Sequence, residues 1–342
     1  MAALVIFNVI NRRALRRDPV FRDRTDDLDF LNDDQLIARY RFPRQSILDL
    51  TDTLRDAIER PSNRSNAIPP HIQVMTTLRI LAMGDYLSEV ADLHDISIAS
   101  ASRVVHSVCA AICERIQNIK FPREEAEQRR VNEMFYDISS FPNVLGAIDG
   151  TLIPIQGMSG DDEPNYVCRK QYHAINVQAI CDAELKFTNT VVKWPGATHD
   201  AFILANSNIP TIMEGQNGWL LGDSGYGLKK WLMTPLMNPN SQQEIGYNKS
   251  HCKTRNTVER AFGVLKARFR CLHKTGESLQ FNPPKCCKMI GACFRLHNKA
   301  CSDGLPVPED VDIQQLAHHN IINDDQQNNE ANAIRRRLIQ RF

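Results

Sequence analysis

The sequence lacks several features that would assign it to a protein class at once. No apolar run approaches the ~18 residues of a membrane-spanning helix. The opening MAALVIFNVINRRALRR places its apolar residues before its arginines, the reverse of a secretory signal, although its basic, acid-poor character is also compatible with a transit peptide. The ten cysteines include no Cys-x-x-Cys pair. We therefore expect an intracellular protein with reduced thiols and no membrane partner.

The chain also lacks a large net charge, but its charges are unevenly distributed. Its 342 residues carry 41 Lys plus Arg and 40 Asp plus Glu, a formal net charge of +1. Residues 251–300 contain 11 basic residues against only Glu259 and Glu277, whereas residues 302–330 contain seven acidic residues and no Lys or Arg. A basic block followed by an acidic segment predicts a surface for a polyanion. The alternative is a basic helix face in water.

The length of the chain and the spacing of its apolar residues predict two folded domains with flanking segments. A hydrophobic content of 42% and a charged content of 24% are ordinary for a globular protein of this size. Apolar residues recur at helical spacing in ILDLTDTLRDAI and VMTTLRILAMG, so the first domain is expected to be all helical. We place a flexible arm at residues 1–30, the helical domain at 31–130, a second domain at 131–301 and an acidic, polar tail at 302–342.

Residues 86–112 of the helical domain have the pattern of a helix-turn-helix. Ser88 is suited to cap a short helix through Leu93, and Ser97 is suited to cap a second one. The inner face of the second helix is apolar, at Ala101, Val104, Val105 and Val108. Its opposite face presents small and polar residues suited to a DNA major groove, namely Ala99, Ser102, Arg103 and His106. An ordinary helical hairpin is the alternative.

The second domain contains strand patterns followed by a strong amphipathic helix. The strand candidates are Gly146–Ile155, Tyr172–Asp182, Phe187–Trp194, Gly218–Leu221 and Trp231–Leu236. The helix is expected over about Thr254 to Cys271, with an apolar stripe at Val258, Phe262, Leu265, Phe269 and Leu272. This order predicts an α/β domain with a mixed sheet and flanking helices.

Four carboxylates fall at positions where they can form one site. Asp149 interrupts the apolar stretch LGAIDGTLIPI, either as a hairpin turn residue or as a side chain that points from a continuous strand into a site. Asp200 and Asp223 follow the third and fourth strand candidates, and Glu259 borders the helical stripe. Carboxylates from separate strands can hold two Mg²⁺ ions around a scissile phosphate. An ion pair between Glu259 and Arg255 is the simpler role for that acid.

The motifs GAIDGT, PGATHD, WLLGDSGY, VERAFGVLKARFRCL and RLHN occur in this order along the chain. In them the chain resembles PIF/Harbinger-type DDE transposases, and more closely the domesticated Harbinger transposase-derived nucleases of vertebrates. The resemblance implies an RNase H-like catalytic core, a mixed five-stranded sheet with flanking helices, behind the helical domain. It also implies a catalytic triad of Asp149, Asp223 and Glu259, with Asp200 as a further metal-site candidate.

The spacing Arg255-x3-Glu259-x6-Lys266 further resembles a signature of bacterial insertion-sequence transposases, but Cys252 stands where that signature has Tyr. We accordingly expect a metal-dependent DNA endonuclease that uses two Mg²⁺ or Mn²⁺ ions, with Lys266, Arg255 and Arg268 on backbone phosphates. The resemblance implies a nuclear protein, also present in the cytoplasm, with a Myb/SANT-like DNA-binding partner and the capacity to form a homo-oligomer. A catalytically silent DNA-binding or scaffold protein of the same descent is the alternative.

Overall fold

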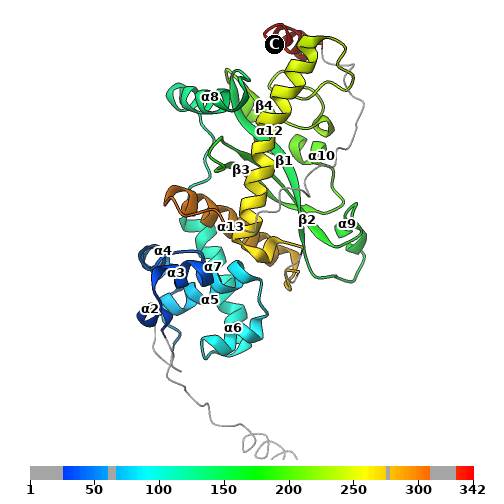
Figure 1. Cartoon of the computed structure of the whole chain (residues 1–342). Coiled ribbons are helices and arrows are strands. Elements are labelled where there is room, and N and C mark those ends of the chain that lie inside the picture. Colours follow the sequence, from blue (N-terminus) through cyan, green and yellow to red (C-terminus); the bar gives the residue numbers. More distant parts are fainter. Residues whose placement is uncertain (1–25, 61–66, 275–277, 309–328) are drawn as a thin grey trace, which may run out of the picture.

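The computed structural model describes residues 26–60, 67–274, 278–308 and 329–342 (Figure 1). The predicted arm at residues 1–30 therefore lies almost wholly outside the described residues. Residues 309–328 of the predicted acidic tail lie outside them as well. All ten cysteines fall within the described parts and are free thiols.

A five-stranded mixed sheet forms the centre of the molecule, as the sequence predicts (Figure 1). Its strands are β1 (Val144–Pro154), β2 (Ala174–Cys181), β3 (Phe187–Pro195), β4 (Trp219–Leu221) and β5 (Leu232–Met233). Their order across the sheet is β3-β2-β1-β4-β5, with β1, β2 and β3 antiparallel and β1, β4 and β5 parallel. Every residue of β2 is buried, so helices must cover both faces of the sheet at its centre.

Helices precede β1 in the chain. They are α2 (Asp27–Phe30), α3 (Asp33–Tyr40), α4 (Arg44–Ile58), α5 (Pro70–Met83), α6 (Leu87–Leu93), α7 (Ile98–Arg115) and α8 (Glu125–Ser139). Helices α2 to α7 gather at one end of the elongated molecule, whereas α8 packs on β1 and α12. The proposed domain boundary at residue 130 falls inside α8, and the division into domains stays a prediction.

Helices α6 and α7 meet at 97° across the four residues 94–97, and together they have the length and composition to pass as a bent membrane span. No single helix in the described parts is long and apolar enough to cross a membrane. Ser97 caps α7 by accepting a hydrogen bond from the Ser100 backbone, as predicted. The prediction for Ser88 was wrong, because α6 begins at Leu87 after Tyr86, which gives no side-chain cap.

Helix α12 (Gln242–Arg268) runs along the length of the sheet (Figure 1). It begins twelve residues before the predicted start, at a capping box formed by Ser241 and Glu244. The polar sequence after this box lacks an apolar stripe, which is why periodicity did not reveal the first turns. The predicted stripe from Val258 to Leu272 is buried throughout and contributes to the core against the sheet.

Helix α13 (Pro283–Ser302) joins the N-terminal helices to the sheet. It packs on α7 and on β3, so a single hydrophobic cluster includes residues from all three elements. The RLHN motif makes these connections. Arg295 donates to the Ile116 carbonyl (3.0 Å), and Asn298 donates to the carbonyls of Phe187 (2.7 Å) and Asn118 (3.0 Å) while accepting the Phe187 N–H. These residues are structural, and none belongs to the carboxylate site.

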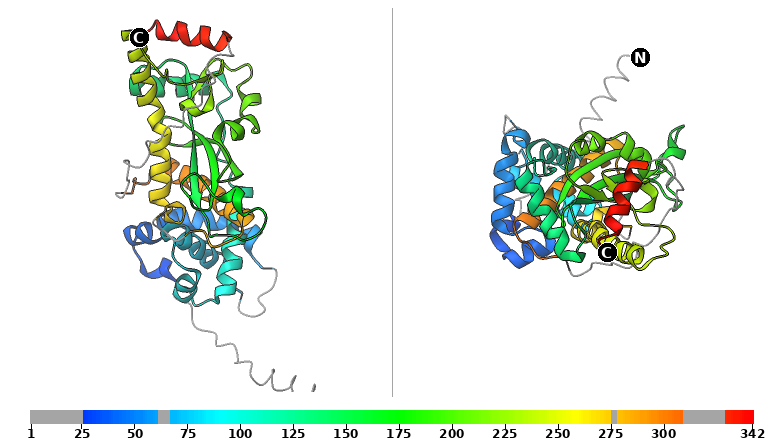
Figure 2. Two further views of the ribbon diagram at one scale, coloured as in Figure 1. Left: turned by 90° about the vertical axis from the view of Figure 1, so that its right-hand side faces the viewer. Right: turned by 90° about the horizontal axis from the view of Figure 1, so that it is seen from above.

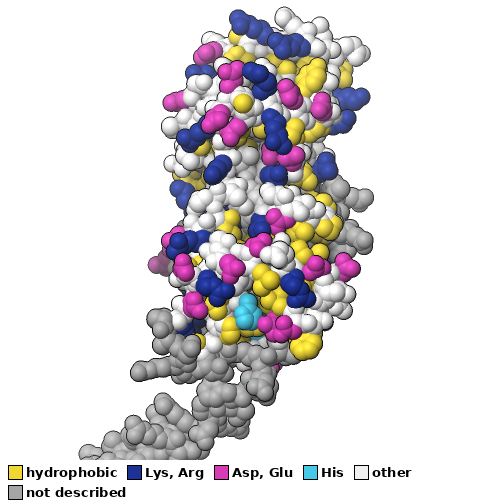
Figure 3. Space-filling view, turned by 90° about the vertical axis from the view of Figure 1, so that its left-hand side faces the viewer, with side chains coloured by type: hydrophobic (Ala, Val, Ile, Leu, Met, Phe, Trp, Pro, Cys, Tyr) yellow, Lys and Arg dark blue, Asp and Glu magenta, His cyan; other side chains and the backbone are white. Residues whose placement is uncertain are grey.

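Helix α14 (Asn329–Ile339) lies at the end of the molecule opposite the N-terminal helices, against α12 (Figure 2). On the face shown in Figure 3, basic and acidic side chains are interspersed over both the helical and the sheet-bearing parts. This face therefore shows no single basic patch.

Candidate active site

Asp149 lies within one continuous strand. β1 runs from Val144 to Pro154 without a break, so the hairpin-turn alternative was wrong. The Asp149 side chain is 19% exposed, and its Oδ1 accepts the Gly150 N–H at 2.8 Å. A carboxylate that is largely withdrawn from water on a buried strand is costly unless a cation or hydrogen-bond donors compensate it.

Asp200 lies against β1 at Gly150, the residue that follows Asp149. It is the first residue of α10 (Asp200–Ala205). A Cβ atom built on Gly150 would come within 2.3 Å of Asp200 Oδ1, so only glycine leaves room for this carboxylate. Two amides of β2 hold it, since Asn176 donates to its Oδ1 (2.9 Å) and Gln178 donates to its backbone carbonyl (3.0 Å).

Asp223 follows β4 and caps the short 3-10 helix η1 (Ser224–Tyr226). Its Oδ1 accepts the Gly225 N–H at 3.0 Å. Tyr226 is buried next to the carboxylates, and its hydroxyl accepts from Gln178 at 3.1 Å. Burial, together with the negative charges of Asp200, Asp149 and Asp223, raises the pKa of Tyr226 well above its usual value. The phenol therefore stays neutral beside the acids.

Glu259 joins the site through Arg255, one turn earlier on α12. Arg255 donates from Nη1 to Asp149 Oδ2 (3.1 Å) and from Nη2 to Glu259 Oε1. Its guanidinium is 7% exposed and lies between the two carboxylates. The ion pair with Glu259 is thus present, and it extends to the strand that carries Asp149.

Burial and the charges of neighbouring acids raise the pKa of both Asp149 and Asp200. Burial, with the charges of Asp223 and Asp200, raises the pKa of Asp149 to about 7 although Arg255 opposes this shift. Burial and the charge of Asp223 also raise the pKa of Asp200, against the hydrogen bond from Asn176. In the described parts of the chain neither Asp200 nor Asp223 forms an ion pair. The cluster therefore carries uncompensated negative charge.

These oxygen donors suit a hard divalent cation, because like-charged carboxylates that share a buried site are stabilised by a cation between them. A preformed ligand cluster, however, was expected and is not seen. Within the described residues no group of three or more His, Cys, Asp or Glu side chains is arranged to hold a metal ion. Arg255 instead supplies the positive charge between Asp149 and Glu259.

The three basic residues expected on DNA phosphates are not equivalent. Arg255 is engaged by the acids, and Arg268 is 3% exposed and donates to the Pro306 carbonyl (3.2 Å), so neither position fits a phosphate contact. Lys266 is half-buried, with its Nζ near the Leu152 carbonyl (3.4 Å) at the end of β1. Burial, with the charge of Lys170, lowers its pKa to about 8.

The predicted DNA-facing residues of α7 do lie at the surface. Ala99 and Arg103 are exposed, while Ser102 and His106 are half-buried. The predicted inner face is buried at all four positions, Ala101, Val104, Val105 and Val108. Their contact with DNA stays a prediction.

Sequence reasoning missed Asn176 and Gln178, which donate hydrogen bonds to Asp200, and Tyr226, which accepts one from Gln178. A signal for the amides was present in AINVQAIC, since two amides two residues apart on an otherwise apolar strand must share one face. Buried amides need partners, and such a pair therefore marks a polar site on that face.

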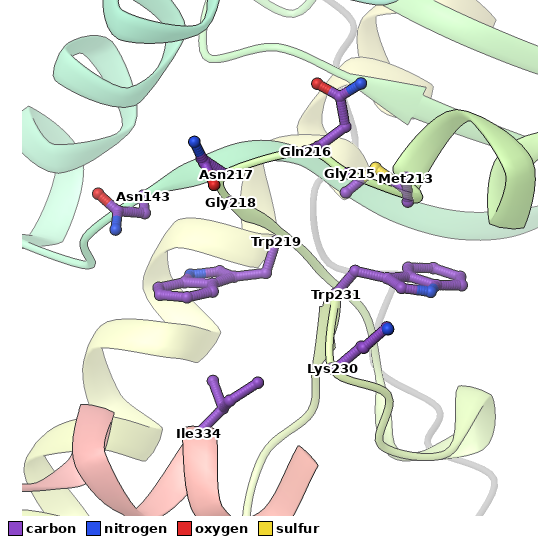
Figure 4. Close-up of a pocket in the computed structure, with 10 residues that line it drawn as sticks. All are labelled: Asn143, Met213, Gly215, Gln216, Asn217, Gly218, Trp219, Lys230, Trp231 and Ile334. Carbon is purple, nitrogen blue, oxygen red and sulfur yellow. The ribbon is translucent and has the colours of Figure 1, made fainter. Parts of the chain in front are cut away.

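A separate pocket of about 520 Å³ lies at the other end of the parallel strands. Figure 4 shows its lining residues, among them Trp219 at the start of β4, Lys230, Trp231 just before β5, and Ile334 of α14. Asp149 is five residues along β1 from Val144, which pairs with Trp219, and so lies on the order of 16 Å from this end. The pocket is not part of the carboxylate site.

Comparison with known proteins identifies the family to which the chain belongs. Residues 148–298 match the family described as DDE superfamily endonuclease, a range that contains all four acids. The chain is 36% identical over 294 residues to the Mus musculus protein named "Putative nuclease HARBI1", covering 83% of this chain and 84% of that protein. The chain belongs to the family of Harbinger transposase-derived proteins.

Further relatives lie within the same family. The Homo sapiens "Putative nuclease HARBI1" is 36% identical over 284 residues, with 82% of this chain and 81% of that protein covered. The Arabidopsis thaliana "Protein ALP1-like" is 27% identical over 267 residues, with 71% of this chain and 64% of that protein covered. No solved structure gives a significant match. The chain thus carries a DDE endonuclease-family domain of transposase descent.

Proposed function

We propose that the protein is a metal-dependent DNA endonuclease with an RNase H-like core that hydrolyses phosphodiester bonds at the site of Asp149, Asp223 and Glu259, with Asp200 as a fourth ligand. The observation that carries the proposal is the electrostatic contact of Asp149 with Asp200 of α10 and Asp223 at the end of β4. Burial, together with the charges of these two acids, raises the pKa of Asp149 to about 7. Buried like charges cost stability, and such perturbed acids are typical of functional sites.

The chain's own residues set up the reaction in distinct ways. Two divalent cations, Mg²⁺ or Mn²⁺, held by these four acids would supply activation of the attacking water and stabilisation of the leaving 3′ oxygen. Asn176 and Gln178 orient Asp200, and the neutral Tyr226 keeps a polar but uncharged wall beside the acids. Lys266 lies at the end of β1, where a flexible cation can contact a DNA phosphate.

DNA recognition belongs, in this proposal, to helix α7. A helix-turn-helix places its second helix in the major groove, and the 97° angle and four-residue turn between α6 and α7 fit that geometry. We place the protein in the nucleus and also in the cytoplasm, with a Myb/SANT-like partner and a capacity to self-associate. The alternative function, a silent DNA-binding scaffold, is favoured by one observation, namely that Arg255 already neutralises Asp149 and Glu259.

Melting curves and plasmid nicking with Mn²⁺ separate the two functions. Mn²⁺ should raise the melting temperature of the wild type, because a ligand that binds only the folded state stabilises it. Asp149→Asn should remove most of this gain and all nicking. Asp137→Asn, at an exposed acid on α8, serves as the control and should behave as the wild type. A wild type that neither nicks DNA nor responds to Mn²⁺ would contradict the nuclease mechanism and favour the scaffold function.

The role of α7 is tested by salt-dependent binding of duplex DNA to the full chain. Ser102→Ala combined with Arg103→Ala should weaken binding and reduce the slope of log affinity against log salt by roughly one unit, because one phosphate contact is lost. The variant Glu114→Ala, near the end of the same helix, should leave the slope unchanged. If the α7 double variant binds like the wild type, α7 is an ordinary helix of a helical hairpin.

A further inference from the structure

Strand β3 is an edge of the sheet, and it bulges close to the carboxylates. Where β3 pairs with β2, Trp194 lies opposite Asn176 and Val192 lies opposite Val177. Lys193, between them on β3, therefore has no partner residue on β2. A bulge of this kind kinks an edge strand and redirects a side chain, and bulges are common beside active sites. Here it brings the ammonium group of Lys193 to 5.0 Å from the centroid of the Trp194 ring.

Trp194 braces an exposed phenylalanine. The ring of Phe202, on α10, meets the ring of Trp194 edge to face, at 5.2 Å between centroids and 84° between planes. Phe202 is nevertheless 52% exposed. A single exposed apolar residue needs no explanation. A phenylalanine that is held rigidly by a second aromatic ring with a cation against it presents a flat, preorganised face with a positive charge nearby.

The aromatic pair Trp194 and Phe202 is connected to the Asp200 carboxylate through α10 and through Asn176 of β2. Phe202 is two residues after Asp200 on the same short helix. The residue opposite Trp194 is Asn176, whose amide donates to Asp200 Oδ1 at 2.9 Å. Since β3 is two strands away from β1, Trp194 lies about 10 Å across the sheet from β1, level with Leu152, which is three residues along the strand from Asp149. The backbone positions of Trp194 and Asp149 are therefore on the order of 14 Å apart, a separation of a few nucleotides along a DNA strand.

We propose that Phe202, which packs against Trp194, stacks on an unpaired base of the DNA a few nucleotides from the scissile phosphate, and that Lys193 contacts the phosphate adjoining that base. This inference rests on the proposed nuclease function and names its substrate as DNA with an unpaired or flipped nucleotide near the cleavage point. Aromatic side chains stack on any base, and a neighbouring cation follows the backbone, which is the combination used to bind single-stranded nucleic acid. A paired base cannot reach this face, because its own neighbours cover both of its sides.

The test uses the full chain in EDTA, so that binding is read without cleavage. The probes are a duplex with one unpaired 2-aminopurine and the matching fully paired duplex. The wild type should bind the first more tightly and change its 2-aminopurine fluorescence. Phe202→Ala should reduce that preference about tenfold, as expected for one lost stacking contact, and leave affinity for the paired duplex unchanged. Phe202→Tyr should retain the preference.

A matched control is available, since Tyr136 on α8 has the same exposure of 52% as Phe202. Tyr136→Ala should bind both probes as the wild type does. Equal binding of the two probes by the wild type, or an unchanged preference in Phe202→Ala, would overturn the inference. An equal loss for both probes would overturn it too, because Phe202 would then be a general contact surface. If the wild type nicks plasmid with Mn²⁺ but shows no preference, only this inference fails. If it neither binds nor nicks DNA, the proposed function fails with it.

Discussion

At the scale of single residues, the site depends on the missing side chain of one glycine as well as on its acids. Gly150 follows Asp149 on β1, and the missing side chain is the space into which the Asp200 carboxylate fits. The GAIDGT motif therefore needs its second glycine for close approach of a second acid rather than for a turn. The Asp200 carboxylate can lie against β1, one residue from Asp149 in that strand, because Gly150 has no Cβ.

Gly150→Ala should therefore displace Asp200. A Cβ at 2.3 Å from Oδ1 cannot be accommodated, so the carboxylate must move away from β1. Nicking should fall on the order of 100-fold, the cost of a misplacement of about 1 Å in a reacting site. The melting-temperature gain with Mn²⁺ should shrink in parallel. Gly157→Ala is the control, because its Cβ would meet only the His173 ring at an ordinary 3.6 Å. Wild-type nicking by Gly150→Ala would mean that Asp200 takes no part.

At the scale of elements, α13 holds the helical end of the molecule and the sheet together. Asn298 is 3% exposed and pairs with both backbone groups of Phe187 on β3, as well as with the carbonyl of Asn118 after α7. One side chain thus forms hydrogen bonds with three backbone groups, the N–H and carbonyl of Phe187 and the carbonyl of Asn118. The two groups of Phe187 need such a partner because Phe187 begins an edge strand.

Asn298→Leu should destabilise the protein by about 3 kcal/mol, because it leaves buried donor and acceptor groups of the backbone unpaired. Urea unfolding followed by circular dichroism measures the change. Lys288→Leu, at an exposed position of the same helix, should change stability by less than about 0.5 kcal/mol. A comparable loss in both variants would show that leucine on α13 is harmful in itself and that the Asn298 contacts contribute little.

At the scale of the whole molecule, three buried histidines are distributed along the long axis. His94 lies beside α6, His297 in α13 and His251 in α12, and all are at most 2% exposed. Burial lowers the pKa of His94 and of His297 to about 4 and that of His251 to about 3. Each is neutral in the folded protein at pH values where the unfolded chain would bind a proton.

The sign of this effect gives a pH dependence. Between pH 6.5 and about 4 these histidines bind more protons in the unfolded state than in the folded state, so their contribution to stability should be constant above pH 6.5 and fall as the pH decreases below it. His297→Gln should reduce the slope by up to about 1.4 kcal/mol per pH unit. Denaturant unfolding across pH should use an Asp149→Asn background, because the raised pKa of Asp149 acts in the opposite direction. Exposed His199→Gln should leave the slope unchanged.

Much of the fold was predictable because its signals are local. The five strands appeared at their positions because the apolar runs of this sheet are short and bounded by glycine, proline or polar residues. Val258, Phe262 and Leu265 predicted the buried face of α12, and Ser97 predicted the start of α7. The helix ends at Arg268, before the predicted end at about Cys271, and the last stripe positions, Phe269 and Leu272, are buried beyond it. The first twelve residues of α12 were not predicted to be helical because they are mostly polar. A capping box alone is a weaker signal for a helix than the periodicity of apolar residues.

The sequence by itself determined the chemistry available to this protein, since the identity and order of Asp149, Asp200, Asp223 and Glu259 follow from motifs that can be recognised along the chain. Only the tertiary structure decided how these acids meet. It placed Arg255 between Asp149 and Glu259, withdrew Arg268 from the surface and exposed Phe202 beside Trp194. Whether a charged side chain faces a partner, solvent or the core depends on elements far away in sequence, and local patterns carry no information about that packing.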